Sequence, residues 1–471
     1  MRESVSIGTI RKPLQPSASI TIMKRRNFLQ TCLAAPLVIP AVAWAQSPNE
    51  RIGIALIGCG GMGTGDIQSA ARFGDVVAVA DADIAHAENV KKIFDGKPIA
   101  YQDYRKLLEN KSVDVVIQAT PDHWHTKINI DALRAGKDVY GEKPLTFTIA
   151  EGQKLCRVVE ETKRVFQTGT QQRSGRDFQT AVELVRNGRL GTLQRVIVAL
   201  PWCSMLGGPF SEQPIPPNLD WDLYQGQAPL RPYYPQRTHA IFRWWYEYTG
   251  GMATDWGNHH VDIAHWGMDV ENTGPVSVEA RGLFPNAGKA DCFNTPDRFY
   301  SEMKYANGVM LHFYVVLGDQ FRFGGIDTYP ETTPEEKAWL WGKDYPKEMD
   351  DNTRNGIMFI GDKGRIFINR GAVHGKPAEE LPENPLPEDA WKAKPSDDHM
   401  KNFFDCVRSR EEPVSPARIE HRSVSACHLT NISMRLGGRK LQWDPEKEEI
   451  VNDAEAKAMQ SRAQREPYTI S

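Results

Sequence analysis

Residues 52–63 read IGIALIGCGGMG, an apolar run followed directly by the pattern GxGxxG. The run predicts a buried strand, and the glycines predict a sharp turn from this strand into a helix. The first glycine permits the turn, the second lets a pyrophosphate approach the backbone, and the third lets the helix pack closely on the strand. The N-terminus of the helix would then face the anion. We therefore predict a dinucleotide-binding loop made of Gly58, Gly60, Gly61, Met62 and Gly63.

An acidic residue follows the next apolar run. Residues 76–80 predict a second strand, and Asp81 comes at its end, 23 residues after Gly58. A carboxylate at this position accepts hydrogen bonds from the 2'-hydroxyl of a ribose and repels a 2'-phosphate. The sequence therefore favours NAD over NADP as the cofactor. The alternative is a turn between strand and helix that binds nothing, since glycine-rich turns are common.

The first part of the chain alternates short apolar runs with helical stretches of about 10 to 15 residues, which is typical of a parallel sheet covered by helices on both faces. We predict an α/β fold with an N-terminal Rossmann domain, a doubly wound parallel sheet, over residues 46–170. Its strands are predicted at 51–57, 76–80, 113–119, 139–140 and 165–167.

The second part has longer apolar runs that are interrupted by hairpin turns at Asn307-Gly308 and at 362–364. We predict an α+β domain with an open, largely antiparallel sheet over 171–445. Its predicted strands lie at 195–200, 276–284, 300–317 and 357–369, its helices within 397–437, an ordered arm or lid at about 205–237, and a tail at 446–471. An open sheet with one uncovered face also predicts a homo-oligomer, a dimer or a tetramer.

Composition narrows the classes of function. Of 471 residues, 40% are hydrophobic and 25% are charged, which is enough for a sizeable core and indicates two domains rather than one. The first 45 residues hold six basic residues and one acidic residue, which leaves 51 basic and 59 acidic residues in the rest, a balance of -8. An acidic chain without a basic stripe is poorly suited to bind nucleic acid or an anionic membrane surface. We therefore expect an enzyme that acts on a small molecule.

Two further motifs follow predicted strands: ATPDHWH at 119–125 and GEKP at 141–144. Together with the glycine loop they resemble the glucose–fructose oxidoreductase, inositol dehydrogenase and rhizopine-catabolism (Gfo/Idh/MocA) family of NAD(P)-dependent oxidoreductases, which carry TPNxxH and EKP at these points. Asp122 replaces the common Asn. The resemblance covers both predicted domains and implies that the cofactor also contacts Thr120, Pro121, His125, Glu142 and Lys143.

The resemblance also implies a role for the lysine of EKP. In the family this lysine points into the cleft beside the nicotinamide, and the match here is Lys143. An ammonium at this place stabilises a developing alkoxide and can lose a proton if its pKa is depressed by burial. The alternative is a turn at a strand end in which Lys143 is solvated.

A third motif, DWGNHHVD at 255–262, puts Asp255, His259 and Asp262 on one face of a predicted helix. It matches the family's DxxxHxxD. The resemblance implies that His259 is the acid/base and that Asp255 binds substrate hydroxyls or orients His259, which would raise the pKa of the imidazole. The alternatives are a polar face packed under a loop and a metal site, but we expect no metal.

Three more residues are candidates because they neighbour these motifs. Arg173, in TGTQQR at 168–173, could reach a substrate hydroxyl or carboxylate, and Trp245 could give a sugar ring a stacking face. Tyr248 directly precedes the predicted helix and is a candidate catalytic acid/base. Aromatic residues of this kind also pack in cores and interfaces, which is the alternative for both.

The N-terminus predicts export. Arg25-Arg26 and Phe28-Leu29 precede an apolar stretch that ends in Ala43-Trp44-Ala45, which resembles a twin-arginine signal cleaved after Ala45. An ordinary secretory signal and a lipid anchor on Cys32 are the alternatives, and 1–22 would be an upstream extension. We therefore expect a periplasmic protein with no membrane span after cleavage.

Export constrains the chemistry, because a periplasm is not expected to hold a soluble NAD pool. The cofactor should then stay bound and be recycled within the enzyme. The family offers two such schemes: a sugar, polyol or glycoside oxidoreductase that reduces a second substrate, and a redox-neutral NAD-dependent glycosidase similar to those that act on α-N-acetylgalactosaminides. A carbohydrate-binding protein without catalysis on the same scaffold remains a third interpretation.

Overall fold

The computed structural model describes residues 51–202, 207–320 and 355–471. The predicted export signal and the start of the predicted arm at 205–206 lie outside these ranges. Within them, no helix combines the length and the apolar character that crossing a bilayer requires.

Six strands form the first sheet in the order β3-β2-β1-β4-β5-β6, with every neighbouring pair parallel. This confirms the doubly wound sheet. The order reverses between β1 and β4, and in such sheets ligands bind at the carboxyl ends of the strands beside this reversal. The sequence analysis missed β3, because an apolar run of only three residues is too short to indicate a strand. The strands are β1 Ile52–Ile57, β2 Gly74–Ala80, β3 Ile99–Tyr101, β4 Val115–Gln118, β5 Asp138–Gly141 and β6 Phe166–Thr168.

Helices from two distant segments pack on this sheet. Phe403 and Phe404 of α11 are fully buried in the same cluster as Ile54 and Leu56 of β1, so a late segment of the chain completes the core of the first domain. The helices are α1 Gly61–Ala70, α2 Ile84–Ile93, α3 Tyr104–Leu108, α4 Asp122–Arg134, α5 Ile149–Thr162 and α11 His399–Ser409.

Nine strands form the second sheet in the order β13-β12-β11-β7-β10-β9-β8-β14-β15. Only the pair of β7 and β10 is parallel among these described strands, so the predicted largely antiparallel sheet is confirmed. The segment predicted as a tail, 446–471, contributes an edge strand, β15, and a helix, α13. The strands are β7 Leu193–Trp202, β8 Pro275–Leu283, β9 Arg298–Tyr305, β10 Met310–Gln320, β11 Gly356–Gly361, β12 Arg365–Asn369, β13 Ala372–His374, β14 Leu441–Asp444 and β15 Glu449–Val451.

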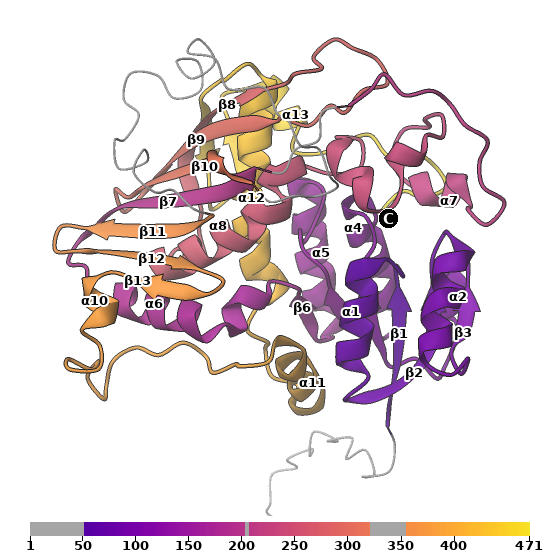
Figure 1. The fold of residues 1–471 in the computed structure, drawn as a ribbon, viewed down its shortest axis with the longest axis horizontal. Helices are drawn as coiled ribbons and strands as arrows, with labels where there is room; N and C mark the ends of the chain where they lie inside the picture. Colours follow the sequence, from indigo (N-terminus) through magenta and orange to yellow (C-terminus); the bar gives the residue numbers. More distant parts are fainter. Residues whose placement is uncertain (1–50, 203–206, 321–354) are drawn as a thin grey trace, which may run out of the picture. The chain divides into compact units, whose positions relative to one another are not determined.

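Helix α8 is packed closely on the second sheet, beside β7 and β11 (Figure 1). A Cβ added at Gly267 of α8 would lie 2.5 Å from the ring of Phe359, so only glycine permits this close approach. The sheet therefore fixes α8, and with it Asp255, the first residue of the helix. The remaining described α-helices are α6 Arg176–Arg186, α7 Trp221–Gln225, α8 Asp255–Met268, α10 Lys376–Glu379, α12 Ala417–Arg435 and α13 Ala454–Ala458.

The described part of the predicted arm, 207–237, continues without a break into 238–253, and we call the whole segment 207–253 the arm. It runs back to the first sheet. The Ile84 amide donates to the carbonyl of Asn218 at 3.0 Å, and the Asp220 amide donates to the carbonyl of Ala82 at 2.9 Å. The arm also carries α7 and three short 3-10 helices. It is therefore ordered against the loop that follows β2, next to Asp81.

Candidate active site

A cleft of about 450 Å³ lies at the carboxyl ends of β1, β2, β4 and β5. Its walls are formed by the glycine loop, the segment after β4, the end of β5, the arm and the start of α8. It therefore lies where the order of the first sheet reverses, the place at which doubly wound folds bind their ligands. The cleft residues discussed below are Gly58, Gly60, Gly61, Met62, Asp81, Thr120, Pro121, Asp122, Glu142, Lys143, Arg243 and Asp255.

The glycine loop leaves an open cradle at one wall of the cleft. Gly58 has φ +95°, and a Cβ there would lie 2.5 Å from the Ala119 carbonyl oxygen; a Cβ at Gly63 would lie 2.0 Å from the Gly58 oxygen. At Gly60 and Gly61 an added Cβ would meet no atom within 4 Å. Gly58 and Gly63 therefore fix the turn, and Gly60 and Gly61 leave room for a ligand at the N-terminus of α1.

Asp81 holds its carboxylate at the end of β2. Its two oxygens accept the backbone N–H groups of Cys59 and Asp83, each at 2.8 Å. These bonds fix the carboxylate at the cleft wall. An open glycine cradle, a helix N-terminus and a fixed carboxylate are the groups that a pyrophosphate and a ribose diol require, so NAD fits this cleft.

An ion pair joins the two domains inside the cleft. The Lys143 Nζ, after β5, makes a short contact with Asp255 Oδ1 at the start of α8, and both side chains are about one-tenth exposed, at 9% and 11%. Arg243 Nε lies 3.3 Å from Asp255 Oδ2. Burial opposes ionisation of this carboxyl, but the charges of Lys143 and Arg243 prevail and lower the pKa of Asp255 to about 2. Asp255 is therefore an anion at any working pH.

A second carboxyl group adjoins the pair. Burial raises the pKa of Glu142 to about 7, although the charge of Lys143 and a 2.7 Å hydrogen bond from Gln171 Nε2 oppose the rise. On α1, burial and the charge of Glu142 also raise the pKa of Asp66. The site thus contains one permanent anion, Asp255, and a carboxyl group, Glu142, that titrates near neutral pH.

Of the two residues predicted beside Pro121 to contact the cofactor, Thr120 lies on the cleft wall and His125 does not. Both ring nitrogens of His125 lie near backbone oxygens, Nδ1 at 2.6 Å from Pro144 O and Nε2 at 2.8 Å from Thr120 O. The imidazole is buried between the two loops. The structure therefore corrects the prediction: His125 connects the loop after β4 to the loop after β5.

His259 is buried behind the cleft wall and differs from the prediction in two ways. Its Nδ1 has no hydrogen-bond partner among the described residues, and no contact between its ring and the Asp255 carboxylate is found. Burial, together with the charge of Lys143, lowers the pKa of His259 instead of raising it, since Asp255 pairs with the lysine. His259 is therefore a neutral imidazole close enough to Lys143 to feel its charge.

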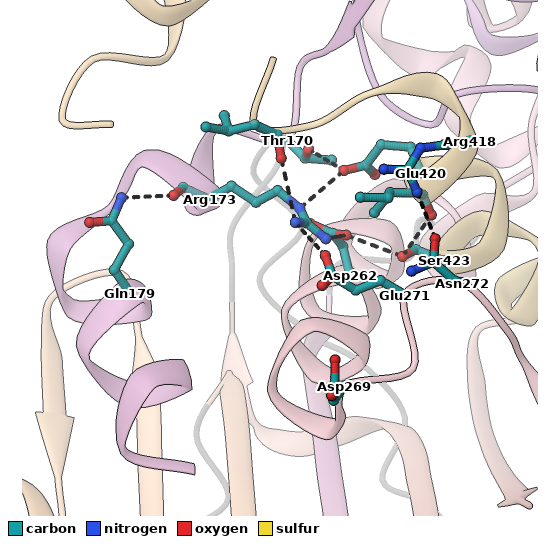
Figure 2. Close-up of polar contacts among 12 residues, drawn as sticks. Thr170, Arg173, Gln179, Asp262, Asp269, Glu271, Asn272, Arg418, Glu420 and Ser423 are labelled. Atoms are coloured by element: carbon teal, nitrogen blue, oxygen red, sulfur yellow. Dashed lines mark hydrogen bonds and ion pairs between the residues drawn. The ribbon is translucent and has the colours of Figure 1, made fainter. Parts of the chain in front are cut away.

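Arg173 belongs to a buried charge network and not to the cleft, which corrects its prediction as a substrate ligand (Figure 2). Its Nε and Nη2 donate to the two oxygens of Asp262 at 2.7 and 2.6 Å, and Nη1 donates to Glu271 at 2.8 Å. Its Nε also lies 3.4 Å from Glu420 Oε1. With three carboxylates around a side chain that is 3% exposed, the guanidinium ties α8 to α12.

Trp245 and Tyr248 are core residues, which corrects their predicted contact with substrate. The indole of Trp245 is buried, donates to the Gln236 carbonyl at 2.6 Å and lies 3.7 Å from the Arg237 guanidinium. The ring of Tyr248 is fully buried 4.9 Å from that of His123, and burial raises the pKa of its phenol to about 12. Neither side chain lines the cleft. Both tie the arm to the rest of the core.

Sequence reasoning missed Arg243 as a partner of Asp255, and it missed His86 and His239, which line the cleft near Asp81. His86 follows Asp81 by five residues, a spacing that could have drawn attention to it. Arg243 and His239 come from the irregular arm, where no periodicity indicates which side chains point inward.

The sequence matches two family models. The model described as an oxidoreductase family with an NAD-binding Rossmann fold matches residues 52–170, and the model described as the C-terminal alpha/beta domain of the oxidoreductase family matches 176–318 and 350–470.

Individual relatives are more distant. The chain is 27% identical over 322 residues to an uncharacterized oxidoreductase, YrbE, of Bacillus subtilis, which covers 68% of the chain and 82% of that protein. It is 30% identical over 182 residues to a myo-inositol 2-dehydrogenase of Thermotoga maritima (37% of the chain, 49% of that protein), and 31% identical over 120 residues to an alpha-N-acetylgalactosaminidase of Shewanella oneidensis (25% and 26%). The chain thus spans half or less of these two relatives.

A solved structure shows the same fold. The WlbA dehydrogenase of Chromobacterium violaceum, in complex with NADH and UDP-GlcNAcA, superposes with a TM-score of 0.58 at 18% identity, covering 84% of this chain and 97% of that one.

Gly60→Ala tests the glycine cradle. The added Cβ would meet no protein atom within 4 Å, so we expect unchanged thermal stability. Because the Cβ would occupy the space predicted for the pyrophosphate, we expect NAD binding to be at least about tenfold weaker in calorimetric titration. Gly65→Ala is the matched control: this helix residue also has open space and lies outside the cleft, so NAD affinity should be unchanged. Equal NAD affinity in both variants would contradict this placement.

Arg173→Met tests the buried network. Removing the cation leaves buried carboxylates without a counter-charge, and we expect a loss of about 3–5 kcal/mol in the free energy of unfolding, measured by urea denaturation. Lys376→Ala, which removes a surface lysine 81% exposed, should leave the midpoint unchanged. A stable Arg173→Met protein with impaired substrate binding would favour the original prediction.

Proposed function

Because the chain belongs to the Gfo/Idh/MocA oxidoreductase family, we propose that it oxidises a hydroxyl group of a sugar, a polyol or a glycoside with NAD as the redox cofactor. The observation that carries this proposal is the ion pair of Lys143 and Asp255 in the same cleft as the glycine cradle. The pair places a cation and a permanent anion where a substrate carbon would lie beside a bound nicotinamide.

Different residues of the cleft would bind different parts of NAD. Gly60 and Gly61 provide the space for a pyrophosphate, and Asp81 provides the acceptor for a ribose diol. Thr120 and Pro121 line the same cleft. When bound, NAD accepts a hydride from the carbon that carries the reacting hydroxyl.

Lys143 is the group that accepts the proton of the reacting hydroxyl. The Lys143 ammonium stabilises the developing alkoxide. Once the ammonium has given up one proton, the neutral amine can take the proton of the substrate hydroxyl. We assign His259 as the partner of Lys143 in this transfer, because its buried Nδ1 has no hydrogen-bond partner among the described residues. Asp255 holds Lys143 in place and, as an anion, accepts hydrogen bonds from neighbouring substrate hydroxyls.

The position of the arm favours a cofactor that stays bound between turnovers. Its backbone hydrogen bonds to residues 82–84 lie next to Asp81, so it borders the part of the cleft that suits an adenosine. In the oxidoreductase scheme, a second substrate then takes the hydride back from the retained cofactor and restores it. Twin-arginine export to the periplasm and a dimeric or tetrameric assembly complete the proposal, and both rest on sequence patterns.

Lys143→Met tests the catalytic assignment. We expect kcat to fall by roughly 10²–10⁴, the usual contribution of a proton-transfer group, while the dissociation constant of NAD changes little. The assay follows reduction of the enzyme-bound nicotinamide over a single turnover by its near-ultraviolet absorbance, with myo-inositol and a panel of aldoses, because an internally recycled cofactor yields no net NADH at steady state. Lys127→Met is the control, since this lysine pairs with Asp131 outside the cleft. Unchanged kcat in Lys143→Met would refute the role.

A second candidate function is redox-neutral glycoside cleavage. Relatives named glycosyl hydrolase family 109 proteins, 26–31% identical over up to 36% of the chain, favour it, as does the alpha-N-acetylgalactosaminidase match. Oxidation of a ring hydroxyl acidifies the neighbouring C–H, and the aglycone then leaves by elimination. Water adds to the double bond, and the ketone is reduced back to the hydroxyl by the hydride that was removed in the first step. Glu142, whose pKa burial raises to about 7, is suited to exchange the protons of these steps.

Isotope incorporation separates the two functions. The enzyme is incubated with an aryl α-N-acetylgalactosaminide in deuterium oxide, and the sugar product is examined by mass spectrometry. Cleavage by elimination should place deuterium on the carbon next to the anomeric centre, because that carbon loses its proton and regains one from solvent. Release of aglycone without deuterium, or no release at all, would exclude this second function.

A further inference from the structure

Three potential metal ligands meet at the edge of the cleft, near Asp81. Asp83 follows β2, His86 lies in the first turn of α2, and His239 comes from the arm. Each offers one ligand atom, and these atoms all lie within 4.8 Å of one another. The chain segments that carry them are far apart in sequence, so the fold brings them together.

The spacing suits a shared cation better than direct hydrogen bonds. His239 Nε2 lies 3.6 Å from Asp83 Oδ2, beyond hydrogen-bonding distance, and the rings of His86 and His239 have centroids 4.3 Å apart. Ligand atoms of a tetrahedral zinc site, with bonds of about 2.0–2.2 Å, lie about 3.3–3.6 Å from one another. A small movement of either imidazole would complete such a site.

Hydrogen bonds already fix the carboxylate of Asp83. Its Oδ1 accepts the Ala85 N–H at 3.0 Å and the Asn218 Nδ2 at 2.6 Å, which leaves Oδ2 toward His239. Asp81 adds a second negative charge, with an oxygen 3.8 Å from His86 Nδ1. A fixed ligand and a nearby anion both favour binding of a cation.

The cluster is also accessible from the cleft. The side chain of Asp83 is 8% exposed, whereas those of His86 and His239 are 31% and 43% exposed. An ion can therefore enter without opening the core, and a water or another oxygen ligand can take the fourth position. Two imidazoles and one carboxylate are a ligand set that zinc and neighbouring transition metals accept, whereas magnesium and calcium prefer oxygen alone.

We propose that Asp83, His86 and His239 bind one divalent transition-metal ion, best matched by zinc, which fastens the arm to the NAD-binding domain beside Asp81. The ion would add a coordinate link to the hydrogen bonds between Asn218, Asp220 and residues 82–84. Because the arm borders the adenosine end of the cleft, the bound ion should slow the release of NAD. The binding site itself does not depend on the proposed reaction.

Calorimetric titration of the full chain tests the proposal. The protein is freed of metal by chelation, and zinc alone is added without nucleotide. We expect one zinc ion per chain, with an affinity at least about tenfold weaker in His86→Ala and in His239→Ala. His374→Ala is the matched control, since this exposed histidine of β13 lies outside the cluster, and its affinity should equal that of the unmodified protein.

Two results would overturn the proposal: no zinc binding at millimolar concentration, or the same zinc affinity in both histidine variants. Circular dichroism melting in the absence of zinc checks that the variants are folded, and His239→Gln repeats the test with a side chain of similar size. The rate of NAD dissociation provides a second measurement. Zinc should slow it in the unmodified protein and leave it unchanged in His239→Ala, and an equal effect in both would contradict the link through the arm.

Discussion

The ion pair between Lys143 and Asp255 is the contact on which the arrangement of the site depends. Lys143 follows β5 of the parallel sheet, and Asp255 begins α8 on the second sheet, so the contact joins the two domains inside the cleft. Both groups are nearly buried, and Lys143 would be a costly uncompensated charge without Asp255. The glycine cradle, Glu142 and Arg243 all lie around this pair in one cleft.

Helix α8 connects this site to the stability of the fold. Its first residue, Asp255, pairs with Lys143 in the cleft, whereas Asp262, two turns later, pairs with the buried Arg173. The helix is thus held by an ion pair at each of two points and by close packing on the second sheet. The two carboxylates of one motif have different roles, because one faces the other domain and the other faces α12 (Figure 2).

Local patterns predicted much of this structure, and contacts distant in sequence account for the rest. The apolar runs and the GxGxxG turn predicted the first sheet, and the resemblance of two motifs to the family predicted Lys143 and Asp255 as site residues, which the structure places in contact. Residue type alone does not determine which neighbours a side chain contacts. Arg173 contacts three carboxyl groups of the core, and Trp245 is buried. Arg243 and His239 reach the cleft from the arm, whose sequence has no hydrophobic periodicity. Their positions could therefore not be predicted before the fold was known.

We propose that this cleft holds NAD through the whole reaction cycle, because the arm that borders it is attached beside Asp81. The most direct measurement is mass spectrometry of small molecules released on denaturing protein that was purified without added nucleotide. The account predicts about one NAD or NADH per chain. Protein that releases no nucleotide, and then binds and loses added NAD rapidly, would contradict a retained cofactor.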